Sequence, residues 1–474
     1  MPPTTRAAAR AHAAAAAAAL PHDLLARICS FLPPGDAILT VPRLNKAWAA
    51  AAAPRIAGVR KAWTALKEVP RPVWLRCRDY HSFSIPLWAL QEAWPQLTRY
   101  QRAQAAARAA CHGDLPTLRW ALPQQDDDGN LFCAAAAAGG QLEALQCARA
   151  LGCEWSDSTC TEATGGGHLA VLQWLRAQQP PCPWDEWTCA EAGRGGHLAM
   201  LQWLRTQQPP CPWDEWTCTE GAKGGHLAVL QWARAQQPPC PWDEYTCSAA
   251  ARSGQLAVLQ WARAQQPPCP WDEYTCSAAA SSGQLAVLQW ARAQQPPCPW
   301  DRTTCIEAAR GGHLAVLQWL RAQQPPCPWD EETCTAAAFG GRVAMLQWLC
   351  AQQPPCPWDE ETCSAAAEGG HLGVLQWLRA QQPPCPWDER TCIEAARGGH
   401  LAVLQWARAQ QPPCAWDEWV CTIAALGGHL AVLQWVRAQQ PPCPWNAAFC
   451  YGITEDAAAA QWIRAQAALE GVAV

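Results

Sequence analysis

Apolar and polar positions repeat every 29 residues along most of the chain. In one central unit, the apolar residues of segment 314–321 cover most of a helix, and Gln318 and Arg321 leave a narrow polar stripe. A short helix that is apolar on most sides must be covered by neighbours. Pro325 and Pro326 are expected to end this bulky helix, because proline lacks an amide hydrogen and disfavours helical geometry in the residue before it.

A second, thinner helix is predicted to begin near Asp330, whose carboxylate can cap free amide groups. Glu331 and Glu332 suit the positive end of its dipole, and residues 333–338 are almost all small. The pair Gly311–Gly312 before the bulky helix suits a left-handed turn that ends the preceding thin helix. Each unit is therefore expected to be a helix–turn–helix that buries its apolar face only by stacking on neighbours.

The units can be counted from the residue that follows the paired small residues. It falls at His168, His197, His226, Gln255, Gln284, His313, Arg342, His371, His400 and His429, always 29 residues apart. Two earlier copies begin at Asp114 and Gln141, 27 residues apart, and a decayed copy lies at 456–462. A period of about 20–50 residues indicates a solenoid. We expect an all-α solenoid of about 12–13 helix pairs.

The unit resembles the ankyrin repeat. Without gaps, the consensus T-P-L-H-x-A-A-x-x-G-H-L aligns with residues 187–198, where the alanine, Gly196–His197–Leu198 and the second-helix leucines match. Trp-Thr-Cys-Ala replaces the Thr-Pro-Leu-His signature, and 29 residues are fewer than the usual 33 or so. The resemblance covers roughly 97–462 and implies a shortened β-hairpin finger. A generic helix-pair solenoid is the close alternative.

A different motif, LPHDLLARICSFLPPGDAILTVPRLNKAW, spans residues 20–48. Its apolar stripe is too small to form a large core alone, so we expect it to need a partner or neighbour. The stretch resembles an F-box, although Asn45–Lys46 stand where the family often has Cys-Arg. The resemblance implies docking on the Skp-type adaptor of a cullin–RING ubiquitin ligase, through Leu20, Pro21, Leu24, Leu25, Ile28 and Leu32. The alternative is a helical cap on the solenoid.

These observations predict five segments. Residues 1–19 form an Ala-rich tail, which can also be interpreted as a transit peptide because it carries arginines and no acid. Residues 20–49 are the F-box-like motif, and 50–96 are a helical connector that caps the solenoid. The repeats occupy 97–446, and 447–474 are a degenerate capping repeat.

Charge is divided unevenly along the chain. Residues 1–112 carry 15 Lys/Arg against 5 Asp/Glu, and the remainder carries 20 against 35, giving +10 and −15 within a total of −5. We therefore expect no nucleic-acid partner for the solenoid, because phosphate contacts need basic groups. The sequence contains no run of 18 apolar residues, so no membrane span is expected. The chain is expected to be a monomer in the cytoplasm or nucleus.

Twenty-eight cysteines recur mainly in two series, one in the loop before a tryptophan, as at Cys182, and one in the thin helix, as at Cys189. Zinc sites use short cysteine pairs with a second pair nearby, and these units have none. We expect reduced, buried cysteines and no cofactor; a metal-binding array is the distant alternative. Two tryptophan ladders, beginning at Trp174 and Trp184, are interpreted as packing between neighbours.

No catalytic constellation occurs, so function is sought at positions that vary within the fixed frame. One series precedes the Thr-Cys pair: Trp187, Trp216, Tyr245, Tyr274, Thr303, Glu332, Glu361, Arg390 and Trp419. The other lies late in the thin helix: Arg194, Lys223, Arg252, Ser281, Arg310, Phe339, Glu368, Arg397 and Leu426. Ankyrin-like stacking implies that thin helices and hairpin tips line a concave face. These series are then expected to contact a partner; drift at exposed sites is the alternative.

The sequence thus favours a non-enzymatic protein–protein interaction scaffold that selects substrates for a cullin–RING ligase. The alternative function is an ankyrin-like tether without a ligase link.

Overall fold

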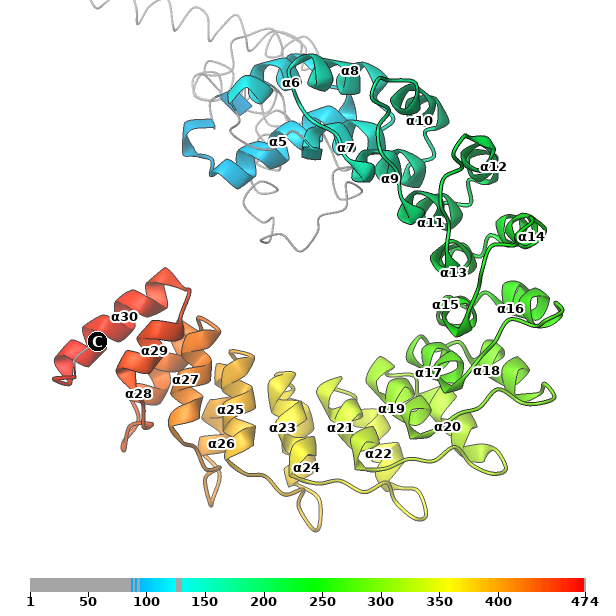
Figure 1. Ribbon diagram of the computed structural model, residues 1–474. Coiled ribbons are helices and arrows are strands. Elements are labelled where there is room, and N and C mark those ends of the chain that lie inside the picture. Colours follow the sequence, from blue (N-terminus) through cyan, green and yellow to red (C-terminus); the bar gives the residue numbers. More distant parts are fainter. Residues whose placement is uncertain (1–86, 88–89, 92–93, 125–129, 473–474) are drawn as a thin grey trace, which may run out of the picture. The chain divides into compact units, whose positions relative to one another are not determined.

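The computed structural model describes residues 87, 90–91, 94–124 and 130–472. Within this part, 26 α-helices form 13 consecutive pairs, and no strand is present. The described chain is an all-helical repeat solenoid, which confirms the predicted fold class at this level (Figure 1). It consists of two compact units, Met1–Thr217 and Cys218–Val474.

The first unit begins its described helices with a short 3₁₀ helix, η4 (Trp94–Gln96). Its helices are α5 (Arg99–His112), α6 (Leu115–Ala121), η5 (Leu122–Gln124), α7 (Asn130–Ala138), α8 (Leu142–Ala150), α9 (Asp157–Gly165), α10 (Leu169–Arg176), α11 (Glu186–Arg194) and α12 (Leu198–Thr206). Helix α13 (Glu215–Lys223) spans the boundary between the two units.

The second unit continues the same alternation of a thin and a bulky helix. Its helices are α14 (Leu227–Arg234), α15 (Glu244–Arg252), α16 (Leu256–Arg263), α17 (Glu273–Ser281), α18 (Leu285–Arg292), α19 (Arg302–Gly311), α20 (Leu314–Ala322), α21 (Glu331–Phe339), α22 (Val343–Cys350), α23 (Glu360–Glu368), α24 (Leu372–Arg379), α25 (Glu389–Arg397), α26 (Leu401–Arg408), α27 (Glu418–Leu426), α28 (Leu430–Arg437), α29 (Ala447–Ile453) and α30 (Ala457–Leu469).

Odd-numbered helices are the first, thin helices of each pair, and even-numbered helices are the second, bulky ones. First helices pack closely against the first helices of neighbouring pairs, whereas second helices contact one another much less. This difference follows from side-chain size, because the alanines of the thin helix allow close approach. Within the second unit, the first helices lie on the inner side of a curved stack and the loops after the second helices project outward (Figure 1).

The core consists of one layer of side chains per repeat. Val316, Leu317 and Leu320 of α20 are fully or almost fully buried, as are Cys334 and Ala337 of α21. The apolar residues of the predicted bulky helix therefore face the neighbouring repeats. Helix α20 ends at Ala322, close to the end predicted from the prolines.

The glycine two residues before each second helix has a specific packing reason. Gly283 has a φ of +73°, and a Cβ atom there would lie 2.6 Å from Nδ1 of His313 in the next repeat. The His313 ring therefore covers the bare glycine backbone, and its Nε2 lies 3.2 Å from the carbonyl oxygen of Ser281. The predicted left-handed turn is confirmed at Gly312, whose φ is +80°.

The F-box-like segment 20–49, with all six adaptor-binding candidates, lies outside the described residues. The same holds for the tail 1–19 and for most of the connector 50–96. Docking on an adaptor therefore stays a prediction.

Candidate functional site

Large aromatic side chains are exposed at equivalent positions of the first helices. We call Trp187, Trp216, Tyr245, Tyr274 and Trp419 the aromatic row. They are 43%, 38%, 56%, 61% and 50% exposed, respectively. All five belong to the first variable series, so the structure places these predicted partner-binding residues at the surface.

Local helix capping explains why these side chains point outward. Asp185 precedes α11, and its Oδ1 accepts a hydrogen bond from the backbone amide of Thr188 at 3.3 Å. This cap fixes the first turn with Thr188 and Cys189 fully buried. Because a helix turns about 100° per residue, Trp187 is left on the exposed side. Asp243 and Thr246 repeat the arrangement at α15.

The second variable series lies seven residues further along each first helix, on the same side after two turns. Lys223, Arg252, Arg310 and Arg397 are exposed, whereas Arg194 is half-buried. Several of these cations pair with a glutamate one turn earlier: Arg194 with Glu191, Lys223 with Glu220, Arg310 with Glu307 and Arg397 with Glu394. Phe339 and Leu426 of this series are also exposed, at 44% and 58%.

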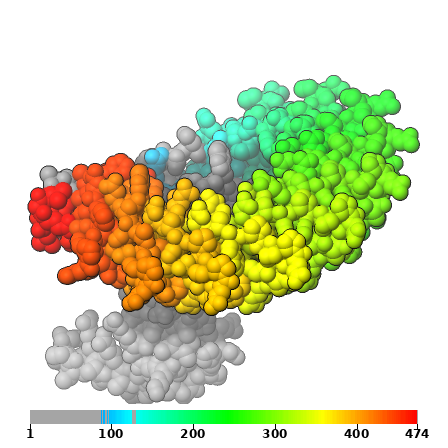
Figure 2. Space-filling view, turned by 90° about the horizontal axis from the view of Figure 1, so that it is seen from below, coloured from blue at the N-terminus to red at the C-terminus, as the bar shows by residue number. Residues whose placement is uncertain are grey.

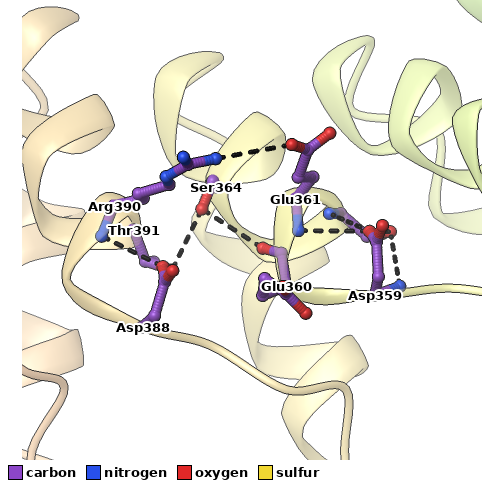
Figure 3. Close-up of polar contacts among 8 residues, drawn as sticks. Asp359, Glu360, Glu361, Ser364, Asp388, Arg390 and Thr391 are labelled. Atoms are coloured by element: carbon purple, nitrogen blue, oxygen red, sulfur yellow. Dashed lines mark hydrogen bonds and ion pairs between the residues drawn. The ribbon is translucent and has the colours of Figure 1, made fainter.

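Equivalent variable residues contact each other between neighbouring repeats. In the first unit, the rings of Trp187 and Trp216 stack with centroids 5.7 Å apart. In the second unit, Nη1 of Arg390 lies 3.4 Å from Oε1 of Glu361, and the two side chains point toward one another in Figure 3. Arg302, the residue before Thr303, reaches the next repeat as well: it lies 2.6 Å from Asp330 and 3.9 Å from Glu332. The variable surface is thus aromatic in some repeats and charged in others.

A layer of hydroxyl groups lies beside this surface. Oγ of Ser364 donates to the carbonyl oxygen of Glu360 at 3.2 Å and lies 3.4 Å from Oγ1 of Thr391 in the next first helix (Figure 3). Asp359 and Asp388 cap the two helices. These contacts hold neighbouring first helices in register, and with them the side chains they expose.

The tryptophan ladders pack between repeats, as predicted. Trp184 of the loop meets Trp203 of the next second helix edge-to-face, with centroids 6.4 Å apart. The guanidinium carbon of Arg176 lies over the Trp184 ring, 3.7 Å from its centroid. Sequence reasoning missed this arginine, although its position before the loop recurs in nearly every unit.

The described cysteines form no disulfide, and almost all are buried. Burial raises the pKa of Cys133 to about 12 and raises that of Cys153 as well. Among the described residues, no group of three or more His, Cys, Asp or Glu side chains is placed to hold a metal ion. None of the described helices has the length and apolar character needed to cross a membrane.

No protein-family model matches the chain, and a search of curated proteins finds no match. Solved structures of a pentatricopeptide repeat protein, PPR10, are similar to it. Its complex with an 18-nt psaJ RNA element has 12% identity and a TM-score of 0.34, and the match covers 98% of this chain and 79% of that one. PPR10 from maize has 13% identity and a TM-score of 0.32, with 100% and 74% covered.

This comparison corrects one prediction. We expected no nucleic-acid partner, but the similar solved structures include complexes with RNA. The physical reason for the error is that a net charge summed over hundreds of residues does not describe one local surface. The chain belongs with helical repeat proteins, and neither the ankyrin family nor the F-box family is shown specifically.

Proposed function

We propose that the chain is a non-enzymatic scaffold that binds a protein partner along its first helices. The observation that carries the proposal is the aromatic row, in which five large rings stand exposed at equivalent positions. Tryptophan, tyrosine and arginine dominate the energetics of protein interfaces. Both variable series place such residues on one side of the first helices.

The neighbouring charges indicate what kind of partner fits. Glu186 and Glu273 precede Trp187 and Tyr274 and are themselves exposed. A partner that offers apolar side chains together with basic ones complements this surface, because complementary charge steers association.

The proposal is tested by capturing partners from extracts of the native cells with the intact chain and with a Trp187→Ala, Trp216→Ala, Trp419→Ala variant. A Gln289→Ala variant is the control, since Gln289 is exposed on a second helix. We expect discrete proteins to bind the intact chain and the control but not the triple variant. Extracts with and without ribonuclease separate direct protein partners from RNA. Capture of RNA alone would contradict the proposal.

The N-terminal motif supports a more specific form of the same function, in which the scaffold delivers its partner to a cullin–RING ubiquitin ligase. The support is the sequence resemblance of residues 20–48 to an F-box. A Leu24→Asp, Leu25→Asp variant should lose a Skp-type adaptor and cullin while keeping the partner bound to the repeats. If the intact chain captures neither ligase component, the scaffold acts without a ligase.

A further inference from the structure

A guanidinium group occupies the same place in nearly every repeat. In ten repeats, the arginine near the end of the second helix lies over the loop tryptophan, with Cζ 3.7–4.6 Å from the ring centroid. In one of these, Arg379 lies 4.2 Å from Trp387 and donates through Nη1 to the carbonyl oxygen of Cys385 at 2.5 Å. Each such site therefore combines an aromatic face with a backbone acceptor.

One repeat has the site without the arginine. Position 350, at the end of α22, is a cysteine. The loop tryptophan of this repeat, Trp358, still packs edge-to-face on Trp377, with centroids 6.1 Å apart. A cavity of about 450 Å³ lies beside Cys350, whose side chain is shorter than the arginine of the other repeats. The cavity is lined by Cys350, Pro355, Cys356, Pro357, Trp358, Gln381, Gln382 and Pro383.

The loop of this repeat keeps the geometry of its neighbours. The backbone amide of Cys356 donates to the carbonyl oxygen of Leu349 at 3.2 Å, and the matching bond from Cys385 to Leu378 is 3.1 Å. The aromatic face and the acceptor are thus already arranged for a planar cation, and the loop has not closed over the space. A preformed site avoids the cost of ordering a loop when a ligand binds.

We propose that this cavity binds the guanidinium group of an arginine side chain supplied by a partner protein. The guanidinium stacks on the face of Trp358 and donates to the carbonyl oxygen of Cys356, as the chain's own arginines do in other repeats. A lysine ammonium is a compact, strongly hydrated charge, and it cannot reproduce a planar stack with a directed donor. The site is therefore selective for arginine.

The lining explains why the arginine comes from a protein and not from the free amino acid. No lining residue is charged, so nothing there pairs with the α-carboxylate or α-amino group. Pro355, Pro357, Gln382 and Pro383 are exposed, which leaves the entrance open to a side chain from outside. Figure 2 looks onto the loop-bearing side of this part of the second unit.

The inference does not rest on the proposed function. The cavity is formed by the end of a second helix and its loop, whereas the aromatic row lies on first helices. Either surface can fail its test without affecting the other.

The test uses the full chain and ligand-detected NMR with Nα-acetyl-arginine methylamide as the probe. We expect saturable, millimolar binding with one site per chain. Cys350→Arg supplies an internal guanidinium and should abolish this binding. Arg379→Cys vacates a second site and should raise the stoichiometry to two. The double variant Cys350→Arg, Arg379→Cys should restore one site, now beside Trp387.

Matched probes decide between ligand classes. Nα-acetyl-lysine methylamide should bind at least several-fold more weakly than the arginine probe. Unchanged binding of the arginine probe in Cys350→Arg and in Arg379→Cys would overturn the proposal that this cavity binds arginine. Equal affinities for the lysine probe and the arginine probe would overturn it as well. Much tighter binding of free arginine than of its capped form would overturn the assignment to a partner protein.

Discussion

Trp187 and Trp216 lie 29 residues apart, yet their rings stack with centroids 5.7 Å apart and an angle of 28° between the ring planes. Each ring remains about two-fifths exposed, at 43% and 38%. Neighbouring repeats therefore hold these rings in fixed positions before any partner binds. Rigid aromatic anchors lose little conformational freedom on binding, which favours their use in recognition.

Removing these rings should have only a small effect on folding. We expect a coupling free energy of about 0.5–1.5 kcal/mol between Trp187→Ala and Trp216→Ala in a double-mutant cycle of urea unfolding. Tyr274→Ala should change stability by less than about 0.5 kcal/mol, because its side chain is mainly in solvent. A loss above about 3 kcal/mol for either tryptophan would identify the pair as core packing.

Two glycines of the second unit should respond to alanine with opposite signs. Gly283 has a φ of +73°, and its new Cβ would collide with the ring of His313. Gly283→Ala should therefore destabilise by more than about 1 kcal/mol. Gly373 lies inside α24, and a Cβ there meets nothing within 4 Å. Gly373→Ala should stabilise by about 0.5–1 kcal/mol in the same urea unfolding measurement. Shifts of the same sign would contradict the packing described for Gly283 against His313.

The arginine-on-tryptophan contact should contribute to stability wherever it occurs. Arg379→Cys removes the contact with Trp387 and the hydrogen bond to Cys385, and we expect a loss of about 1–3 kcal/mol. Cys350→Arg adds the same contact beside Trp358 and should gain about 1 kcal/mol. Thermal unfolding of both variants tests this, and a destabilising Cys350→Arg would show that its loop cannot accept the guanidinium.

Buried thiols should make the fold sensitive to alkali. Burial raises the pKa of Cys133 to about 12. Hydrogen bonds with Cys160 and Cys189, and then burial, raise the pKa values of Cys182 and Cys211. An unfolded thiol has a pKa of about 8.5, so above that pH the unfolded chain releases protons that the folded chain retains. Stability should fall above about pH 9, by up to about 1.4 kcal/mol per pH unit for each such thiol.

Urea unfolding between pH 7 and pH 10 measures this effect. Cys133→Ala should show a shallower decline above pH 9, because one buried thiol has been removed. Equal stability of the intact chain at pH 7 and pH 10 would show that the thiols are accessible to solvent.

The repeat period and the local helix signals predicted most of the fold. Pro325, Gly312 and Asp330 each predict a helix boundary, and the structure has boundaries at or near these places. Asp330 stands at the N-cap position as expected, but its carboxylate pairs with Arg302 and makes no cap hydrogen bond. The variable positions could also be identified from the sequence, because most other positions are nearly identical from repeat to repeat while positions such as that of Trp187 differ. Periodicity therefore located both the scaffold and its candidate surface.

Contacts between repeats could not be predicted in the same way. The position of Arg379 over Trp387 depends on the path of the loop that follows α24, and the sequence of one repeat alone does not determine that path. Cys350 is informative only because ten other repeats place an arginine over the loop tryptophan at the equivalent position. The class of partner could not be predicted from the sequence either. The net charge led us to exclude a nucleic-acid partner, and the comparison with solved structures contradicts that exclusion.

Binding of a protein partner by the first helices can be tested by site-specific photo-crosslinking in native cells. A photoreactive phenylalanine replaces Tyr274 in the aromatic row, and in a control chain it replaces Gln289 on the neighbouring second helix. We predict discrete protein adducts at position 274 that are absent at 289 and are lost when Trp187, Trp216 and Trp419 are changed to alanine. Identical adducts at both positions, or adducts with RNA alone, would contradict it.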